Sequence, residues 1–89
     1  MSKSIMQEDK VCYISGATIG LDRHHCFGGI RRKAAEKYGC WVWLRHDLHM
    51  ELHDNNPALK QMIQRACQAR FEEIYSHEEF VEVFGKSYL

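Results

Sequence analysis

The sequence predicts a small single domain of the α+β class, and three observations lead to this prediction. The chain has 89 residues, of which 45% are hydrophobic and 27% are charged, and these are the proportions of a folded domain rather than of a disordered chain. An aromatic and branched run over 40–44 follows Gly39 and is typical of a strand. The second half of the chain carries apolar residues at the spacing of amphipathic helices.

The first half is expected to hold β segments with a loop and a short helix between them. Residues 11–14 are a short strand-like run followed by a turn, and residues 18–25 are a second candidate strand. A helix is expected over 30–38, because good helix formers lead up to Gly39 at the place of a C-terminal cap. The strongest strand candidate is 40–44.

Three helices are expected after this strand. Leucines recur every four residues and predict a helix over 45–53. A longer helix is expected over 57–75, with Asn56 as its N-cap and a proline at its first position. A short helix over 76–85 is expected from the capping box that begins at Ser76.

The N-terminal segment and the charge of the chain limit the location and the partners that we expect for the protein. Residues 1–10 are polar and are expected to form a flexible tail before a single domain over 11–89. Twelve Lys and Arg balance twelve Asp and Glu, which excludes a basic coat, so any contact to nucleic acid must come from a local basic patch. The sequence has neither a signal-peptide pattern nor a membrane-spanning run. We therefore expect a cytoplasmic protein without a membrane partner, with its four cysteines as thiols.

Histidine is concentrated in the middle of the chain, where five of the six histidines lie between positions 24 and 53. His49 and His53 are one helical turn apart, so both can bind one divalent metal, and a third ligand from a strand would leave a position open. His24 and His25 are adjacent, so one could bind the metal while the other faces a substrate. Such a site suits hydrolysis of a phosphodiester, with a neutral imidazole taking a proton from water. The alternative is that these histidines are ordinary polar surface.

The order of these and neighbouring residues resembles small phage and prophage HNH nucleases, members of the ββα-metal (His-Me finger) superfamily. The resemblance covers roughly residues 11–89. The residues that carry it are Asp22-Arg23-His24-His25-Cys26-Phe27-Gly28-Gly29, Arg32-Lys33, Glu36-Lys37-Tyr38-Gly39, Trp43-Leu44, His49, His53 and the closing segment 78–89.

The resemblance implies a ββα-metal (HNH) core over about 11–54 and a C-terminal two-helix extension over about 57–85. It implies a metal-dependent endonuclease of phage or prophage origin that hydrolyses DNA, with His25 as the general base. The ligands of the single divalent cation that it implies are His24, His49 and His53. The cation could be Mg²⁺, Mn²⁺, Ni²⁺ or Zn²⁺, and three imidazoles favour the borderline ions over Mg²⁺.

Basic side chains beside the histidines are candidate contacts to DNA. Either Arg23 or Arg45 could neutralise the scissile phosphate. Three further basic residues follow the Gly28-Gly29 pair and could contact phosphates. They are Arg31, Arg32 and Lys33. In both cases the alternative is a solvated surface charge.

Two departures from the family pattern concern cysteines. Many such nucleases hold a structural zinc with two Cys-x-x-Cys pairs, but here Ser15 replaces the cysteine that would pair with Cys12, and the second pair would fall at Arg45 and Leu48. We therefore expect no structural zinc, with Cys12 as a small buried hydrophobe. Cys40 stands near the place of the middle Asn of the HNH motif, a residue that orients the general base.

These departures favour a second hypothesis, in which a catalytically degenerate HNH fold binds DNA, or binds and inhibits a phage or host protein, without cleavage. A third hypothesis is a purely structural helical oligomer whose histidines are incidental. Phe80 and Phe84 are expected either in the core or at the interface of a homodimer.

Overall fold

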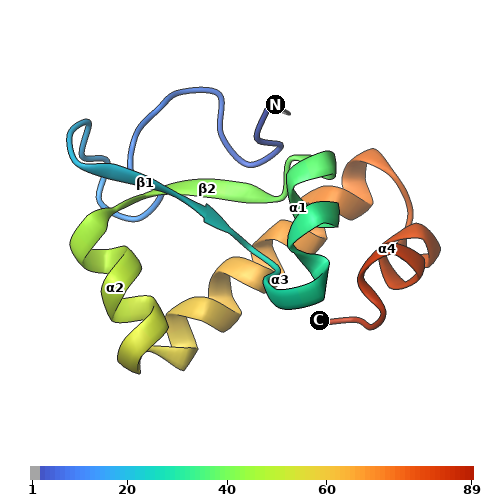
Figure 1. Cartoon of the computed structure of the whole chain (residues 1–89). Helices are drawn as coiled ribbons and strands as arrows, with labels where there is room; N and C mark the ends of the chain where they lie inside the picture. The colour runs from blue at the N-terminus through green and yellow to red at the C-terminus, as the bar shows by residue number, and fades with distance from the viewer. Residues whose placement is uncertain (1–2) are drawn as a thin grey trace.

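Over residues 3–89 the fold consists of a two-stranded sheet and four α-helices (Figure 1). The computed structural model describes residues 3–89. In chain order the elements are strand β1 (Leu21–His25), the 3₁₀ turn η1 (Gly29–Arg31), helix α1 (Arg32–Tyr38), strand β2 (Trp41–Arg45) and helices α2 (His46–Asn55), α3 (Pro57–Ile74) and α4 (His77–Phe84). The prediction of the α+β class is confirmed. No helix within residues 3–89 combines the length and apolar character that crossing a membrane requires.

The two strands pair antiparallel, with His24 opposite Val42 and His25 opposite Trp41. Because side chains alternate along a strand, His24 and Val42 point to one face of the sheet and His25 and Trp41 point to the other. Leu44 shares the face of Val42, and both are fully buried. We call the face that carries Val42 the inner face and the opposite one the outer face.

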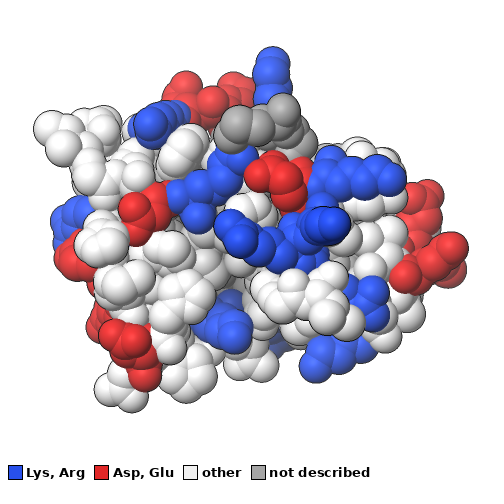
Figure 2. All heavy atoms as spheres, viewed as in Figure 1, with Lys and Arg blue, Asp and Glu red and all other residues white. Residues whose placement is uncertain are grey.

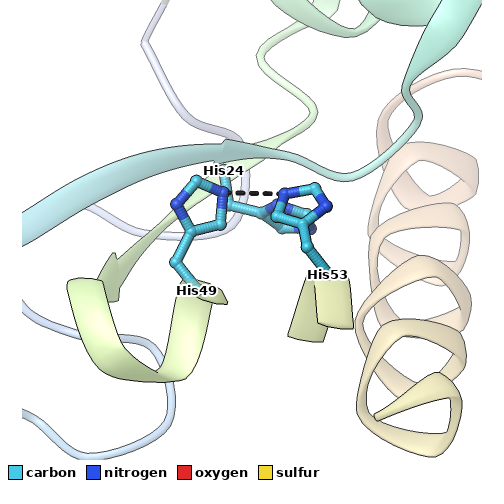
Figure 3. A group of neighbouring side chains, drawn as sticks. All are labelled: His24, His49 and His53. Atoms are coloured by element: carbon cyan, nitrogen blue, oxygen red, sulfur yellow. Dashed lines mark hydrogen bonds between the residues drawn. The ribbon is translucent and has the colours of Figure 1, made fainter. Parts of the chain in front are cut away.

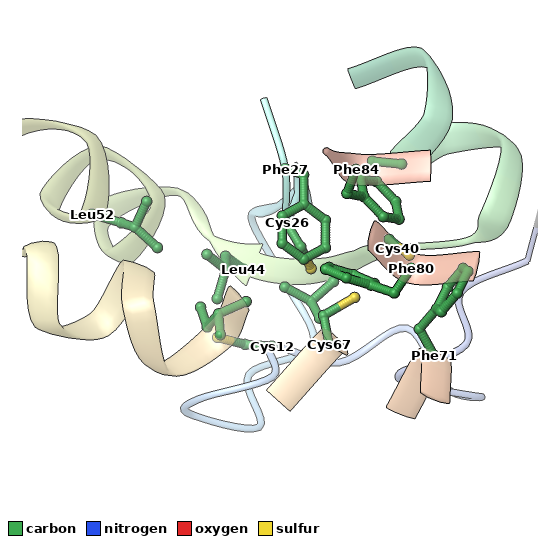
Figure 4. Close-up of a cluster of buried hydrophobic side chains, with 13 residues drawn as sticks. Cys12, Cys26, Phe27, Cys40, Leu44, Leu52, Cys67, Phe71, Phe80 and Phe84 are labelled. Atoms are coloured by element: carbon green, nitrogen blue, oxygen red, sulfur yellow. The ribbon is translucent and has the colours of Figure 1, made fainter. Parts of the chain in front are cut away.

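The core continues from the inner face into an aromatic cluster built by the C-terminal helices (Figure 4). Phe27, two residues after the end of β1, lies with its ring centroid 4.6 Å from that of Phe84 and 5.4 Å from that of Phe80. Phe71 of α3 contacts both of these α4 rings. Each aromatic side chain buries roughly 150–250 Å², so α4 is a main source of core area for this short chain. Phe80 and Phe84 are therefore core residues.

The helix ends follow the predicted capping. The Asn56 side chain accepts a hydrogen bond from the Leu59 amide at 3.0 Å, and the Ser76 hydroxyl accepts one from the Glu79 amide at the same distance. Gly39 ends α1 with a φ of 73°, a left-handed conformation that favours glycine. The sequence therefore predicts the helices well where a capping residue marks their ends. The helix expected over 30–38 differs only in that its first turn is the 3₁₀ turn η1.

The strand expected over 11–14 is wrong, because these residues form bends and turns. The Tyr13 amide donates to the Trp43 carbonyl at 2.8 Å, but the Cys12 amide turns back to the Ala17 carbonyl. A strand needs a repeated ladder with its neighbour, and this segment leaves β2 after one bond. The candidate strand over 18–25 begins only at Leu21, since Gly20 takes a left-handed φ of 69°.

The segment expected as a flexible tail makes defined contacts over residues 3–10. The Ser4 hydroxyl donates to the Trp41 carbonyl at 2.6 Å, and the Ile5 amide donates to the Gly39 carbonyl at 2.9 Å. The side-chain oxygen of Gln7 accepts from the Trp43 amide at 2.9 Å. The bonds at Trp41 and Trp43 satisfy backbone groups of β2 that do not face β1, its partner strand within residues 3–89, and the bond at Gly39 satisfies the end of α1. The polar composition of residues 3–10 does not by itself indicate that they bind the backbone in this way.

Candidate metal centre

Three imidazoles from distant parts of the chain meet below the inner face of the sheet (Figure 3). His24 comes from β1, whereas His49 and His53 come from successive turns of α2. One ring nitrogen from each residue lies within 4.8 Å of the others, and the Nε2 atoms of His49 and His53 are 3.1 Å apart. The chain brings them together because β2 pairs with β1 and leads without a loop into α2.

His24 is the buried member of the cluster. Its exposure is 5%, and its Nε2 atom has no hydrogen-bond partner within residues 3–89. Burial, and then the neighbouring His49 and His53, lower the pKa of His24 to about 4. The ring is therefore neutral near pH 7 and keeps a lone pair for an external partner. A buried polar nitrogen without a partner is costly, and a bound cation would remove that cost.

Asp22 fixes the orientation of His49. Its Oδ2 atom lies 3.0 Å from Nδ1 of His49 and 2.6 Å from Nδ1 of His46. The two hydrogen bonds hold the pKa of the Asp22 carboxyl below its usual range, and the bond from His49 contributes more than the bond from His46. An ionised carboxylate only accepts, so the His49 proton is on Nδ1 and the lone pair of Nε2 faces the cluster. His46 binds the same carboxylate oxygen from outside the cluster, so it is a partner of Asp22 and not one of the three converging imidazoles.

The cluster fits a divalent cation. Ligand nitrogens about 2.0–2.1 Å from a tetrahedral zinc lie roughly 3.3 Å from one another, close to the 3.1 Å between the His49 and His53 nitrogens. Three imidazoles suit zinc, nickel and similar ions better than magnesium. A three-residue set also leaves a coordination position open. The prediction that His24, His49 and His53 could hold a metal ion together is met by the geometry.

His25 lies on the outer face of β1 but opens to the same cavity as the cluster. The cavity has a volume of about 300 Å³. Its lining includes Arg23, His24, His25, Gly28, Gly29, Arg32, His49 and His53. Because His25 is the last residue of β1, its ring lies at the end of the sheet, next to the cavity that also opens to the inner face. Its Nε2 atom is 3.4 Å from Oε1 of Glu36. The segment that contains Glu36 contributes to the family resemblance, but the sequence predicted no role in the site for this residue.

The predicted basic residues separate into two groups. Arg32 lines the cavity with Arg23, and Lys33 lines an adjoining cavity of about 510 Å³ that also contains His25. Arg31 instead donates to the Val83 carbonyl near the end of α4 at 3.2 Å.

Arg45 lies at the other end of the sheet from His25, where it pairs with Leu21 of β1. Its guanidinium forms a two-bond ion pair with Asp47 at 2.6 and 2.8 Å. Arg45 is not among the residues that line the cavity, so the geometry favours Arg23 and Arg32 as the cations beside the histidines. In Figure 2, Lys and Arg side chains gather over the part of the surface where α1 and β1 lie.

Cys12 lies against Ser15 and the start of α2. Its sulfur accepts hydrogen bonds from the Ser15 amide at 3.4 Å and the Arg45 amide at 3.3 Å. Burial raises the pKa of the Cys12 thiol, but bonds from the Ser15 side chain and from nearby amides outweigh burial and lower this pKa to about 7. Cys12 is buried, as expected, and its sulfur is a hydrogen-bond acceptor.

Cys40 is fully buried. Contact with the Cys67 thiol, together with burial, raises the pKa of Cys40, so it remains a protonated thiol of the core. It does not contribute a polar group to the cavity lining.

Comparison of the chain with protein-family models, with curated protein sequences and with solved structures finds no match.

Proposed function

We propose that the protein is a metal-dependent endonuclease of the HNH type that hydrolyses phosphodiester bonds in DNA. The observation that carries the proposal is the convergence of His24, His49 and His53 at one point, beside a cavity that His25 also lines. Three ligands with an open position, and a further imidazole next to them, are the groups that metal-assisted hydrolysis of a phosphodiester needs.

Each residue has a separate task in this mechanism. His24, His49 and His53 hold one divalent cation, which when bound supplies Lewis-acid stabilisation of negative charge on the phosphate. His25 takes a proton from the attacking water. Arg32 contacts a phosphate oxygen from the cavity wall, and Lys33 contacts a neighbouring phosphate from the adjoining cavity.

The distribution of charge supports a polyanionic substrate. Between residues 22 and 45 the chain has six Lys and Arg but only two Asp and Glu, although the whole chain is neutral. A basic patch of this kind attracts nucleic acid without a basic coat over the rest of the protein. The choice of DNA over RNA comes from the resemblance to HNH nucleases.

The test is cleavage of plasmid DNA by the purified protein with Mg²⁺, Mn²⁺, Ni²⁺ or Zn²⁺. We expect nicking or cutting that a chelator abolishes and that His25→Ala reduces by about 10²–10⁴-fold, the usual contribution of a positioned general base. His77→Ala is the matched control, because this exposed histidine is paired with Glu72 far along the chain from the cluster. Equal activity of the His25→Ala and wild-type proteins would contradict the assignment of the base.

A second candidate function is a DNA- or protein-binding module of the same fold that does not cleave. The observation that favours it is the buried thiol of Cys40, near the place where an orienting Asn is expected. This reading predicts a DNA mobility shift, or capture of a defined partner, with no cleavage by any of the four metals at protein excess.

A further inference from the structure

We propose that Glu36 is the positioning residue that orients His25, in place of the missing middle Asn of the HNH motif. The inference rests on the proposed function, in which His25 is the general base. It concerns a carboxylate on α1 that contacts the outer face of β1, opposite the metal ligands.

The Glu36 carboxylate joins two residues of β1. Its Oε1 atom accepts from Nη1 of Arg23 at 2.8 Å and lies 3.4 Å from Nε2 of His25. Helix α1 holds it there, because the preceding residue, Ala35, is fully buried in the core and Gly39 caps the helix end. The His25 side chain is only 11% exposed, so few alternative ring orientations are available to it.

This contact determines which ring nitrogen of His25 can act as a base. An ionised carboxylate accepts hydrogen bonds and donates none, so the neutral His25 ring carries its proton on Nε2. Nδ1 then keeps the lone pair that takes a proton from water. The same logic applies in catalytic triads, where a carboxylate selects the tautomer and orientation of the histidine base.

Arg23 strengthens the arrangement. Its guanidinium lies 3.8 Å from the centroid of the Trp41 ring and donates to the same Glu36 oxygen that faces His25. The positive charge favours the ionised form of Glu36, and the stacking on Trp41 restricts the guanidinium. Arg23 therefore supports the carboxylate, which leaves Arg32 as the cation of the cavity wall that contacts the substrate phosphate.

The competing explanation is an ordinary ion pair that fastens α1 to β1 and has no effect on the tautomer of His25. Long-range ¹H–¹⁵N NMR spectra of the metal-free 89-residue chain separate the two, because they distinguish protonated from bare ring nitrogens. At a pH above the titration range of histidine we expect His25 to carry its proton on Nε2 in the wild type. In Glu36→Gln and Glu36→Ala we expect a mixture of tautomers.

The kinetic test uses single-turnover cleavage at saturating DNA. We expect Glu36→Gln to lower the cleavage rate by about 10-fold or more, but by less than His25→Ala does, with DNA affinity and metal affinity changed by less than about twofold. Glu73→Gln is the matched control, since Glu73 forms an Arg pair at 3.0 Å on α3 that does not involve the histidines. In a His25→Ala background rescued by added imidazole, the Glu36→Gln change should have no further effect.

The outcomes distinguish this inference from the proposed function. A wild type that cleaves normally beside an equally active Glu36→Gln variant overturns the role of Glu36 and leaves the nuclease intact. A wild type without cleavage overturns the proposed function, and the NMR spectra then decide the role of Glu36 alone. A proton on Nδ1 of His25 in the wild type, or an unchanged tautomer in Glu36→Ala, overturns the positioning role in either case.

Discussion

Adjacent histidines on β1 point to opposite faces of the sheet, and each face has its own carboxylate. On the inner face Asp22 binds Nδ1 of His49, so that Nε2 is directed at the cluster. On the outer face Glu36 lies next to Nε2 of His25. One kind of pair, a carboxylate with an imidazole, thus contacts opposite nitrogens of the ring on the two faces, and our proposals give each pair a different task.

The two faces also differ in access to solvent. The inner face buries His24, whose Nε2 atom lacks a partner within the part of the chain that the structure describes. On the outer face the His25 side chain is 11% exposed and that of Glu36 is 36% exposed. In the proposed function the buried lone pair of His24 holds the cation, and the His25 ring exchanges protons with water through the cavity that it lines. The proposed role of each histidine thus follows from the face of the strand on which it lies.

The largest expected effect is the loss of metal affinity when a ligand on the inner face is removed. His49→Ala should lower the affinity for Zn²⁺ or Ni²⁺ by roughly 100-fold or more, because loss of a ligand should exceed the about 10–100-fold cost of disturbing its outer partner. Isothermal titration calorimetry measures the change. His46→Ala is the control, since His46 binds the same Asp22 oxygen from outside the cluster. Comparable metal affinity in the two variants would show that the cluster does not bind the ion.

The next effect is on the stability of the metal-free protein. The folded-state pKa of His24 is lowered from 6.5 to about 4, so between these values the unfolded chain binds more protons and stability rises with pH. The free energy of unfolding should therefore fall by up to about 3 kcal/mol as the pH drops from about 6.5 to about 4.

Urea unfolding of the wild type and of His24→Gln over this pH range isolates the contribution of His24. The depressed pKa of Asp22 acts in the same direction, because the deprotonated form of each group is the stabilised one. Its effect falls mainly below the usual value of 3.8, and the variant retains it. His77→Gln should keep the full pH dependence. A wild-type slope that survives in His24→Gln would refute the link between burial of this ring and stability.

The smallest expected effect is a difference in metal affinity between variants of the two carboxylates. Asp22→Asn should weaken metal affinity by about 10–100-fold, because the amide no longer selects the His49 tautomer. Glu36→Gln should leave metal affinity nearly unchanged. Paired metal titrations of these two variants check the contrast, and a similar loss in both would mean that the two faces of β1 are not functionally separate.

Local patterns in the sequence predicted the helices and the common face of His49 and His53. Spacing of one helical turn placed His49 and His53 together, and the caps at Asn56 and Ser76 located the helix starts. These features depend on residues close in the chain. Asp22 was also within reach of sequence reasoning, because it is two residues before His24 and a strand directs both to one face.

The remaining features depend on contacts between distant segments, which have no regular spacing. Glu36 reaches His25 only through the path of the loop and of η1, and the bond from Arg31 to Val83 spans more than half of the chain. The strand expected over 11–14 failed for the opposite reason, since a β-like composition does not supply a partner. The run of basic residues over 31–33 likewise does not indicate which of them forms a hydrogen bond to α4.

The aromatic cluster connects the last helix to the wall of the cavity beside the histidines. Phe27 follows the His24–His25 doublet by two residues and is clamped between rings of α4, while Arg31 ties the next turn to the end of the same helix. The backbone between these two anchors carries the two glycines of the cavity wall. Loosening α4 would therefore make that wall less rigid, even though no α4 side chain lines the cavity.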